Sequence, residues 1–310
     1  MARILIMGLG ALGSVYAALM KSTGHEVHGV GLAAEHIEAA SASGLRVSGA
    51  SGDRTVHLDS VATTTEGLDG DFDLIIIATK AYDVERAALD VAPLVGQNTI
   101  IQSIQNGIGS MDLIAPHLPQ ARLCLGVVGG FGASVPEPGH AHHNGMALIR
   151  FSPYSTLPMA EVERAVEIWR SAGFYASPLL NPSQVMWEKL IMNVAFSGPG
   201  VLNKLTIGEM MSDENAWQVS RACLEEAFTV AKTLSVPISF NDPVEHVRTL
   251  AGNIPEAKPS MLLDAIRGSR GEIDVINGSV VRFGRDAGVP TPVNTTVVNL
   301  VKAWETTLEK

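Results

Sequence analysis

The segment from Arg3 to Tyr16 constrains the fold of this chain more than any other stretch. A short apolar strand over residues 3–7 runs directly into a glycine-rich turn, and a helical apolar periodicity follows at once. The turn reads Gly8-Leu9-Gly10-Ala11-Leu12-Gly13. Its first glycine permits a tight exit from the strand, its second lets the backbone approach a pyrophosphate, and its third lets the helix pack closely on the sheet. The segment predicts a dinucleotide-binding turn, with the phosphates facing the helix N-terminus.

Short apolar strands alternate with helical segments through the first half of the chain. The strongest strand covers 73–78, a helix is predicted over 84–94, and further strands are predicted over 99–103, 123–128 and 147–151. This alternation is typical of a mostly parallel, doubly wound α/β sheet that is covered on both faces.

The pattern changes near residue 181, where strand signals almost vanish. Helices are predicted over 185–196, 217–234, 243–250, 260–266, 273–286 and 293–308. We therefore expect a dinucleotide-binding domain over residues 1–178 and an all-helical substrate and catalytic domain over residues 179–310.

Composition excludes several classes of protein. The net charge of −10 argues against a general nucleic-acid or anionic-membrane surface, so that local cations must hold any anionic substrate. Cys124 and Cys223 stand outside any metal-ligand spacing and are predicted to be reduced core residues of a cytoplasmic protein. A signal peptide and a run of 18 apolar residues are both absent from the sequence, so no membrane span is expected.

Ligands of open parallel sheets bind beyond the carboxyl ends of the strands. Thr79-Lys80 follows one predicted strand, where the ammonium is either a ligand contact or a solvated loop lysine. Gln105-Asn106-Gly107-Ile108-Gly109 follows the next strand, and its Asn-Gly pair is either a plain turn or a group that orients a carboxamide or substrate oxygen.

The first predicted helix of the second half carries a polar strip. Lys189, Asn193 and Ser197 are spaced by four residues, so successive members drift by only about 40° around the helix. The strip is either the solvated side of an amphipathic helix or the polar lining of a cleft, and the single charge in it favours the cleft. Gly198-Pro199-Gly200 is predicted to end or kink this helix.

Further polar candidates lie near two later helices. Ser260 and Asp264 are either functional residues or ordinary polar side chains on the protein surface. Glu272 is predicted at the start of the helix over 273–286, where a carboxylate is favoured by the helix dipole whether or not it has a function. The closely spaced histidines His140, His142 and His143 are interpreted as part of an exposed connection without a metal.

Together these motifs, in this order from end to end, resemble the ketopantoate reductase (2-dehydropantoate 2-reductase) family. The resemblance implies a Rossmann domain followed by an all-helical domain, with a nicotinamide cofactor held between them. It also implies reduction of 2-dehydropantoate to pantoate, a step of pantothenate and coenzyme A biosynthesis.

The resemblance implies a role for each candidate. Lys189 matches the catalytic lysine that bonds the ketone oxygen and supplies the proton, and Glu272 matches the glutamate that orients the cofactor ribose or this lysine. Asn106 matches a residue that touches both cofactor and substrate. Asn193, Ser197 and Ser260 match substrate-contacting positions, and Lys80 with the glycine turn matches cofactor contacts.

The chain departs from the family pattern at two positions. Ser197 replaces a second asparagine, which leaves another branched or aromatic 2-oxo acid open as substrate. Leu32 stands near the usual arginine for the adenosine 2′-phosphate, so NADP is favoured by the resemblance while NAD stays possible, with Glu35 as a late ribose partner. A non-catalytic nucleotide sensor is the alternative of another class, and a homodimer is the expected assembly.

Overall fold

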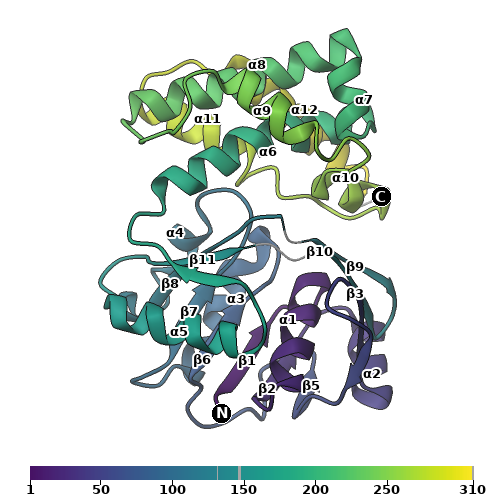
Figure 1. The fold of residues 1–310 in the computed structure, drawn as a ribbon, viewed down its shortest axis with the longest axis vertical. Coiled ribbons are helices and arrows are strands. Elements are labelled where there is room, and N and C mark those ends of the chain that lie inside the picture. Colours follow the sequence, from purple (N-terminus) through teal and green to yellow (C-terminus); the bar gives the residue numbers. More distant parts are fainter. Residues whose placement is uncertain (131, 146–147, 309–310) are drawn as a thin grey trace. The chain divides into compact units, whose positions relative to one another are not determined.

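A computed structural model of the protein describes residues 1–130, 132–145 and 148–308. The chain divides into two compact units (Figure 1). The first unit comprises Met1–Gln105 and Ser110–Pro182, and the second joins Asn106–Gly109 to the chain from Ser183 onward. It stays a prediction that residues 1–178 bind the cofactor and that residues 179–310 bind the substrate.

The first unit is built on an eight-stranded sheet of order β12-β11-β8-β7-β6-β1-β2-β5. Every neighbouring pair is parallel except β8 with β11. The strands of this sheet are β1 (Arg3–Met7), β2 (Glu26–Val30), β5 (Ser60–Ala62), β6 (Leu74–Ile77), β7 (Ile100–Ser103), β8 (Leu123–Val128), β11 (Ile149–Pro153) and β12 (Ala176–Pro178). The predicted doubly wound α/β sheet is confirmed, and the part of the predicted strand at Ala147 lies outside the described residues.

The sheet carries an apolar cluster on each face because its central strands alternate their side chains. Ile4, Ile6, Leu74 and Ile76 belong to one buried cluster. Leu5, Met7, Ile75 and Ile77 belong to the other. The helices of this unit are α1 (Ala11–Ser22), α2 (Ala34–Ser43), α3 (Val84–Val91), α4 (Ser110–Ile114) and α5 (Met159–Ser171), with short 3-10 turns η1 (Ala81–Asp83), η2 (Ala92–Leu94) and η3 (Gln120–Arg122). Burial on both faces explains why residues 4–7 of β1 and all of β6 are apolar at consecutive positions.

A second, four-stranded sheet of order β4-β3-β10-β9 was not foreseen in the sequence. Its strands are β3 (Leu45–Gly49), β4 (Arg54–Val56), β9 (Gly132–Glu137) and β10 (His140–Gly145). The histidines form strand β10, so their interpretation as an exposed connection is wrong. His143 is buried, whereas His140 and His142 both hydrogen-bond the hydroxyl of Ser48. Strand β10 was not recognised in the sequence because its residues are polar: pairing with neighbouring strands defines it, and an apolar pattern does not. The described residues contain no cluster of three metal-ligating side chains.

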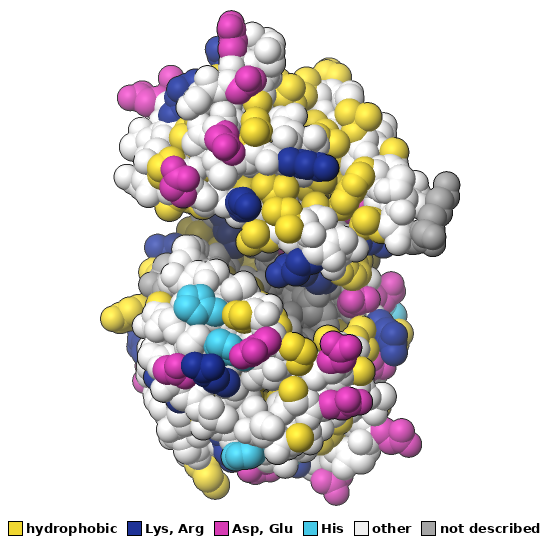
Figure 2. Space-filling model, turned by 90° about the vertical axis from the view of Figure 1, so that its right-hand side faces the viewer, with side chains coloured by type: hydrophobic (Ala, Val, Ile, Leu, Met, Phe, Trp, Pro, Cys, Tyr) yellow, Lys and Arg dark blue, Asp and Glu magenta, His cyan; other side chains and the backbone are white. Residues whose placement is uncertain are grey.

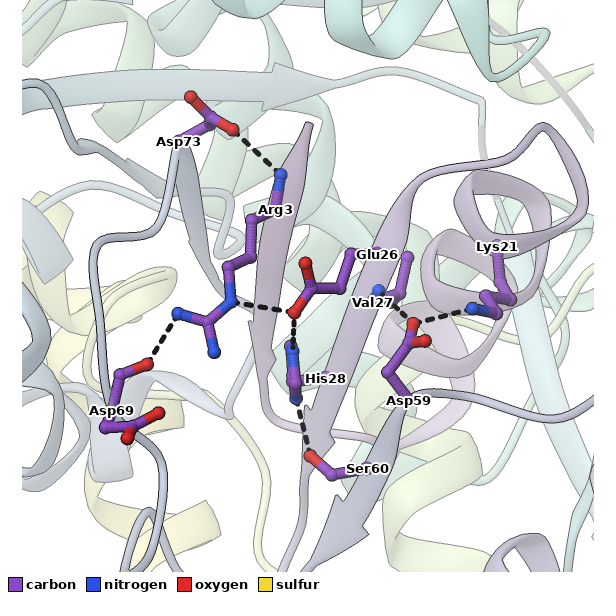
Figure 3. Close-up of polar contacts among 9 residues, drawn as sticks. All are labelled: Arg3, Lys21, Glu26, Val27, His28, Asp59, Ser60, Asp69 and Asp73. Atoms are coloured by element: carbon purple, nitrogen blue, oxygen red, sulfur yellow. Dashed lines mark hydrogen bonds and ion pairs between the residues drawn. The ribbon is translucent and has the colours of Figure 1, made fainter. Parts of the chain in front are cut away.

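Charged side chains link the amino ends of the central strands (Figure 3). Arg3 at the start of β1 pairs with Glu26 at the start of β2 at 2.8 Å, and the same carboxylate accepts from His28 at 2.9 Å. Asp59 accepts from the Val27 amide at 2.7 Å. These contacts join the strand starts and lie away from the carboxyl ends, so we regard them as structural.

The second unit is helical, as predicted. Its helices are α6 (Ser183–Asn203), α7 (Ile207–Ser212), α8 (Glu214–Thr233), α9 (Pro243–Ala251), α10 (Ser260–Ile266), α11 (Asn277–Asp286) and α12 (Pro292–Glu305). Helix α6 packs against α8, α10 and α12. On the face drawn in Figure 2, apolar side chains gather on this unit. Within the described ranges, none of the helices has the length and apolarity that crossing a membrane requires.

The Gly198-Pro199-Gly200 sequence was predicted to end or kink helix α6. The helix runs through it, so an end at this point is wrong, whereas a kink stays a prediction. All three residues are buried. A side chain at Gly198 would collide with Val297 of α12, and one at Gly200 would approach Pro259 to 3.2 Å. Close packing of neighbouring elements over these small residues stabilises the helical path and outweighs the unfavourable proline.

Candidate active site

The glycine turn has the geometry that a dinucleotide requires. Gly8 adopts φ +113°, and a Cβ there would stand 2.5 Å from the Thr79 amide nitrogen, so only glycine fits. A Cβ at Gly13 would collide with the Gly8 carbonyl, which explains why α1 packs so closely on β1. At Gly10, by contrast, no described atom lies within 4 Å of such a Cβ. Gly10 is also the N-cap residue of α1, and because it has no side chain, it does not cap the first amides of the helix. The turn, which includes Leu9, Ala11 and Leu12, therefore fits a pyrophosphate.

A pocket lies beside this turn at the carboxyl ends of β1, β2 and β6. Its lining residues are Met7, Gly8, Val30, Gly31, Leu32, Thr79, Asp83, Arg86, Ala87 and Asp90. Leu32 is 58% exposed, as expected for a residue that follows the strand into solvent. Arg86 was missed in the sequence, although its spacing from Asp83 and Asp90 places the three on one face of the α3 region. Its Nε lies 3.7 Å from Asp90 Oδ2. One guanidinium and two carboxylates thus stand in the lining of this pocket.

The positions of Lys80 and Glu35 do not decide whether either residue contacts the cofactor. Lys80 follows β6 and Thr79, is partly buried, and precedes the short turn η1. Glu35 lies in the first turn of α2 and is exposed. Their predicted cofactor contacts stay predictions.

A second polar group lies wholly within the helical unit. It comprises Lys189, Asn106 and Glu272, and we call it the Lys189 centre. The Nζ atom of Lys189 donates to Asn106 Oδ1 at 2.9 Å, and Asn106 Nδ2 donates to Glu272 Oε2 at 3.5 Å. The amide is thus oriented with its oxygen toward the ammonium and its nitrogen toward the carboxylate. The structure brings together three residues that are widely separated in sequence.

Asn106 reaches this centre because the segment Asn106–Gly109 is bound to the helical unit. The Ile108 amide donates to the Val275 carbonyl at 2.8 Å, and Arg282 donates to the Ile108 carbonyl at 3.3 Å. Gly107 has φ +78°, and a Cβ there would collide with Val275. The Asn-Gly pair is therefore a turn whose tight approach also delivers the asparagine side chain.

Electrostatics tune the ammonium of Lys189. Burial lowers the pKa of Lys189 from 10.5 to about 8, against the opposing effect of the Glu272 carboxylate. Glu272 is itself only 6% exposed. A buried carboxylate needs cationic or hydrogen-bonding partners, and those that the centre supplies are the Asn106 amide and the nearby ammonium.

Glu272 does not begin a helix, so that part of the prediction is wrong. Residues 273–276 form turns, with the Gly278 amide bonded to the Ile273 carbonyl, and α11 begins only at Asn277. The side chain of Asn277 donates to the Val194 carbonyl of α6 and to Asn294, which holds the helix start in place. The carboxylate of Glu272 therefore does not lie in the first turn of helix α11.

The remaining substrate candidates lie on α6 and α10. Asn193 is partly buried and Ser197 is 5% exposed, so the strip that starts at Lys189 is not a solvated face. Ser260 is the exposed first residue of α10, which packs against α6. Asp264 is buried and pairs with Arg267 at 2.7 Å, which gives it a structural partner.

Comparison with known proteins agrees with this architecture. The family model described as ketopantoate reductase PanE/ApbA matches residues 4–156, and its C-terminal counterpart matches residues 181–305. A 2-dehydropantoate 2-reductase of Archaeoglobus fulgidus is 31% identical over 306 residues and 99% of both chains. One of Halobacterium salinarum is 27% identical over 97% of this chain and 98% of its own. The chain belongs to the ketopantoate reductase family.

Solved structures share the fold along the whole chain. A PanE/ApbA family ketopantoate reductase from Ralstonia eutropha JMP134 superposes with a TM-score of 0.89 at 29% identity, covering 99% of this chain and 100% of that one. A D-mandelate dehydrogenase solved with NADH and anilino(oxo)acetate gives a TM-score of 0.91 at 24% identity, over 99% of this chain and 100% of that one. The latter likeness concerns the fold alone.

Proposed function

We propose that this protein reduces 2-dehydropantoate to pantoate with a nicotinamide cofactor. The observation that carries the proposal is the Lys189 centre, in which a partly buried ammonium with a pKa near 8 is hydrogen-bonded to an oriented amide. A ketone that accepts hydride develops alkoxide charge, and such an ammonium stabilises that charge and then supplies a proton. Family membership supports the same reaction.

The residues of the centre divide the work. When bound, the nicotinamide supplies the hydride. Lys189 Nζ bonds the ketone oxygen and transfers its proton there as charge develops. Asn106 restricts the direction of the ammonium through the 2.9 Å hydrogen bond, and Glu272 favours its protonated form. The pKa near 8 keeps the group largely protonated at neutral pH while easing release of the proton.

The glycine turn and its pocket support a dinucleotide as cofactor. Family resemblance favours NADP, and Arg86 is the cation in the lining of the pocket that also includes Leu32, which stands near the usual arginine position. Asp83 and Asp90 in the same lining keep NAD as the alternative, because carboxylates suit ribose hydroxyls better than a phosphate. Lys80 is proposed as a further cofactor contact.

Ser197 supports a second candidate substrate. Its side chain is buried on the face of α6 that starts at Lys189, and a hydroxyl offers fewer hydrogen bonds than the usual asparagine amide. Another branched or aromatic 2-oxo acid is therefore the alternative substrate, with Asn193 and Ser260 as further proposed contacts.

We also propose a homodimer. The helical unit exposes large apolar side chains at Val219, Leu234, Leu250, Ile254, Ile266 and Leu300. Figure 2 shows apolar side chains gathered on one face of this unit, and a gathered apolar surface supports association of two chains, which singly exposed side chains would not.

A matrix of both nicotinamides against a panel of 2-oxo acids tests the function. We expect the highest kcat/KM for 2-dehydropantoate with NADPH. A higher value for an unhydroxylated branched or an aryl 2-oxo acid would favour the second substrate class. Failure to oxidise either nucleotide with every 2-oxo acid would refute the reductase and favour a nucleotide-sensing protein.

A further inference from the structure

A carboxylate at the end of the last helix holds the segment that leads into Glu272. The Gly271 amide donates to Oε1 of Glu305 at 2.9 Å. The second oxygen, Oε2, lies 3.4 Å from Nε of Arg270. Both oxygens of Glu305 thus have a partner in the two residues that immediately precede Glu272.

Burial makes these contacts strong constraints. The side chain of Glu305 is 8% exposed, and a buried carboxylate is costly unless it is paired and hydrogen-bonded. Hydrogen bonds from a backbone amide to a carboxylate are shorter and stronger than those between neutral groups. The hydrogen bond from the Gly271 amide to Glu305 is therefore the contact that restrains the backbone at this position.

The same segment continues into the Lys189 centre. Glu272, the next residue, accepts from Asn106 at 3.5 Å. Three residues further along, the Val275 carbonyl accepts the Ile108 amide at 2.8 Å, in the turn that carries Asn106. A displacement of this segment would move both partners that orient the ammonium of Lys189.

We propose that Glu305 is a positioning residue: it fixes the backbone at Gly271 so that the Glu272 carboxylate keeps its place beside Asn106 and Lys189. Its catalytic consequence rests on the proposed reductase function, whereas its effect on the titration of Lys189 does not.

The charges around these groups provide an internal control. Arg270 faces Glu305 and also lies 3.4 Å from Asp274, which pairs in turn with Lys302 of α12. The Lys302 and Asp274 side chains are 46% and 49% exposed. A pair as exposed as this contributes little, so removal of Lys302 should leave the segment in place.

The titration of Lys189 measures the effect without substrate or cofactor. Protein labelled with ¹³C at lysine Cε is titrated by NMR, and the signal of Lys189 is assigned with Lys189→Arg. Because Glu272 raises the pKa of Lys189, we expect a lower pKa in Glu305→Ala, by about half a unit or more. Glu305→Gln keeps an oxygen for the Gly271 amide and should titrate like the parent protein, as should Lys302→Ala.

Two outcomes would overturn the proposal. One is a Glu305→Ala protein that melts at a lower temperature but titrates Lys189 at the parental pH, because the role of Glu305 would then be stability alone. The other concerns the milder Glu305→Asp, which shortens the reach to Gly271 and is used if the alanine variant does not fold: an unshifted titration there contradicts positioning. Absence of reductase activity in the parent protein would refute the proposed function but leave this readout intact.

Discussion

Lys189 Nζ donates a 2.9 Å hydrogen bond to Oδ1 of Asn106, a residue 83 positions earlier in the chain. The amide nitrogen of the same asparagine points to Glu272. Donor and acceptor therefore alternate from ammonium to amide to carboxylate, an arrangement that restrains all three side chains. The ammonium that we assign to the ketone is oriented before substrate binds, as preorganised electrostatic stabilisation requires.

The first prediction concerns pH. Reduction needs protonated Lys189, so its kcat/KM should fall as pH rises through about 8, where the ammonium loses its proton. Glu272→Gln removes the carboxylate that favours the charged form and should move this limb to lower pH, by about one unit. Steady-state profiles of kcat/KM between about pH 6 and about pH 10 measure the position of this limb in the parent protein and in the variant. A limb that stays in place in the variant would contradict the assigned role of Glu272.

The second prediction concerns the nucleotide. If Arg86 pairs with the 2′-phosphate, Arg86→Gln should weaken NADPH binding about tenfold and leave NADH binding nearly unchanged. Binding is measured by quenching of protein fluorescence. Arg221→Gln is the matched control, because Arg221 is also paired with a carboxylate four residues later. Equal losses for both nucleotides would show that Arg86 acts only on the fold of the pocket.

The third prediction concerns the substrate. Ser197→Asn restores an amide on the face of α6 that begins at Lys189, and should raise the preference for 2-dehydropantoate over its analogue without the hydroxyl, by about tenfold in kcat/KM. Since Ser197 is 5% exposed, a melting curve checks that the larger side chain is accommodated. An unchanged ratio in the folded variant would remove Ser197 from the substrate site.

The fourth prediction concerns stability. Hydrogen bonds from His28 and Arg3 lower the pKa of Glu26 in the folded protein. The stabilisation that the ionised carboxylate provides is therefore fully present above the unfolded-state pKa and is lost as the pH falls through the lower pKa of the folded state. Its side chain is 38% exposed, so Glu26→Gln should reduce the free energy of unfolding at neutral pH by less than about 1 kcal/mol. Urea titrations at neutral and acidic pH measure the difference, which should shrink in acid. A constant difference would show that charge is not the cause.

The sequence predicted the features that local patterns encode. The glycines at positions 8, 10 and 13 predicted the dinucleotide-binding turn, and apolar runs such as Leu74–Ile77 predicted the strands of the sheet. Helical spacing placed Lys189 and Ser197 on one face. Contacts between residues far apart in the chain could not be predicted from local patterns. One example is the Asn106–Gly109 segment, which joins the helical unit through a hydrogen bond to Val275. Another is strand β10, which is polar but pairs with β3 and β9.

Arg86 and Glu305 were missed for a related reason. Each is a charged residue on a helix, where side chains usually face solvent without a binding role, and Arg86 is itself 68% exposed. Only the fold shows that one lines the pocket and that the other is buried against the Gly271 amide. The resemblance to a family implied a role for Glu272 at the site, whereas spacing alone assigned this residue to a helix start.

The most direct test is single-turnover hydride transfer in Lys189→Ala. Preformed enzyme–NADPH complex is mixed with 2-dehydropantoate, and loss of nicotinamide absorbance is followed in parent and variant. We expect the rate to fall by about 10²–10⁴-fold, while NADPH affinity stays within about twofold and the exposed control Lys232→Ala behaves like the parent. A folded Lys189→Ala protein that transfers hydride at the parental rate would contradict the account.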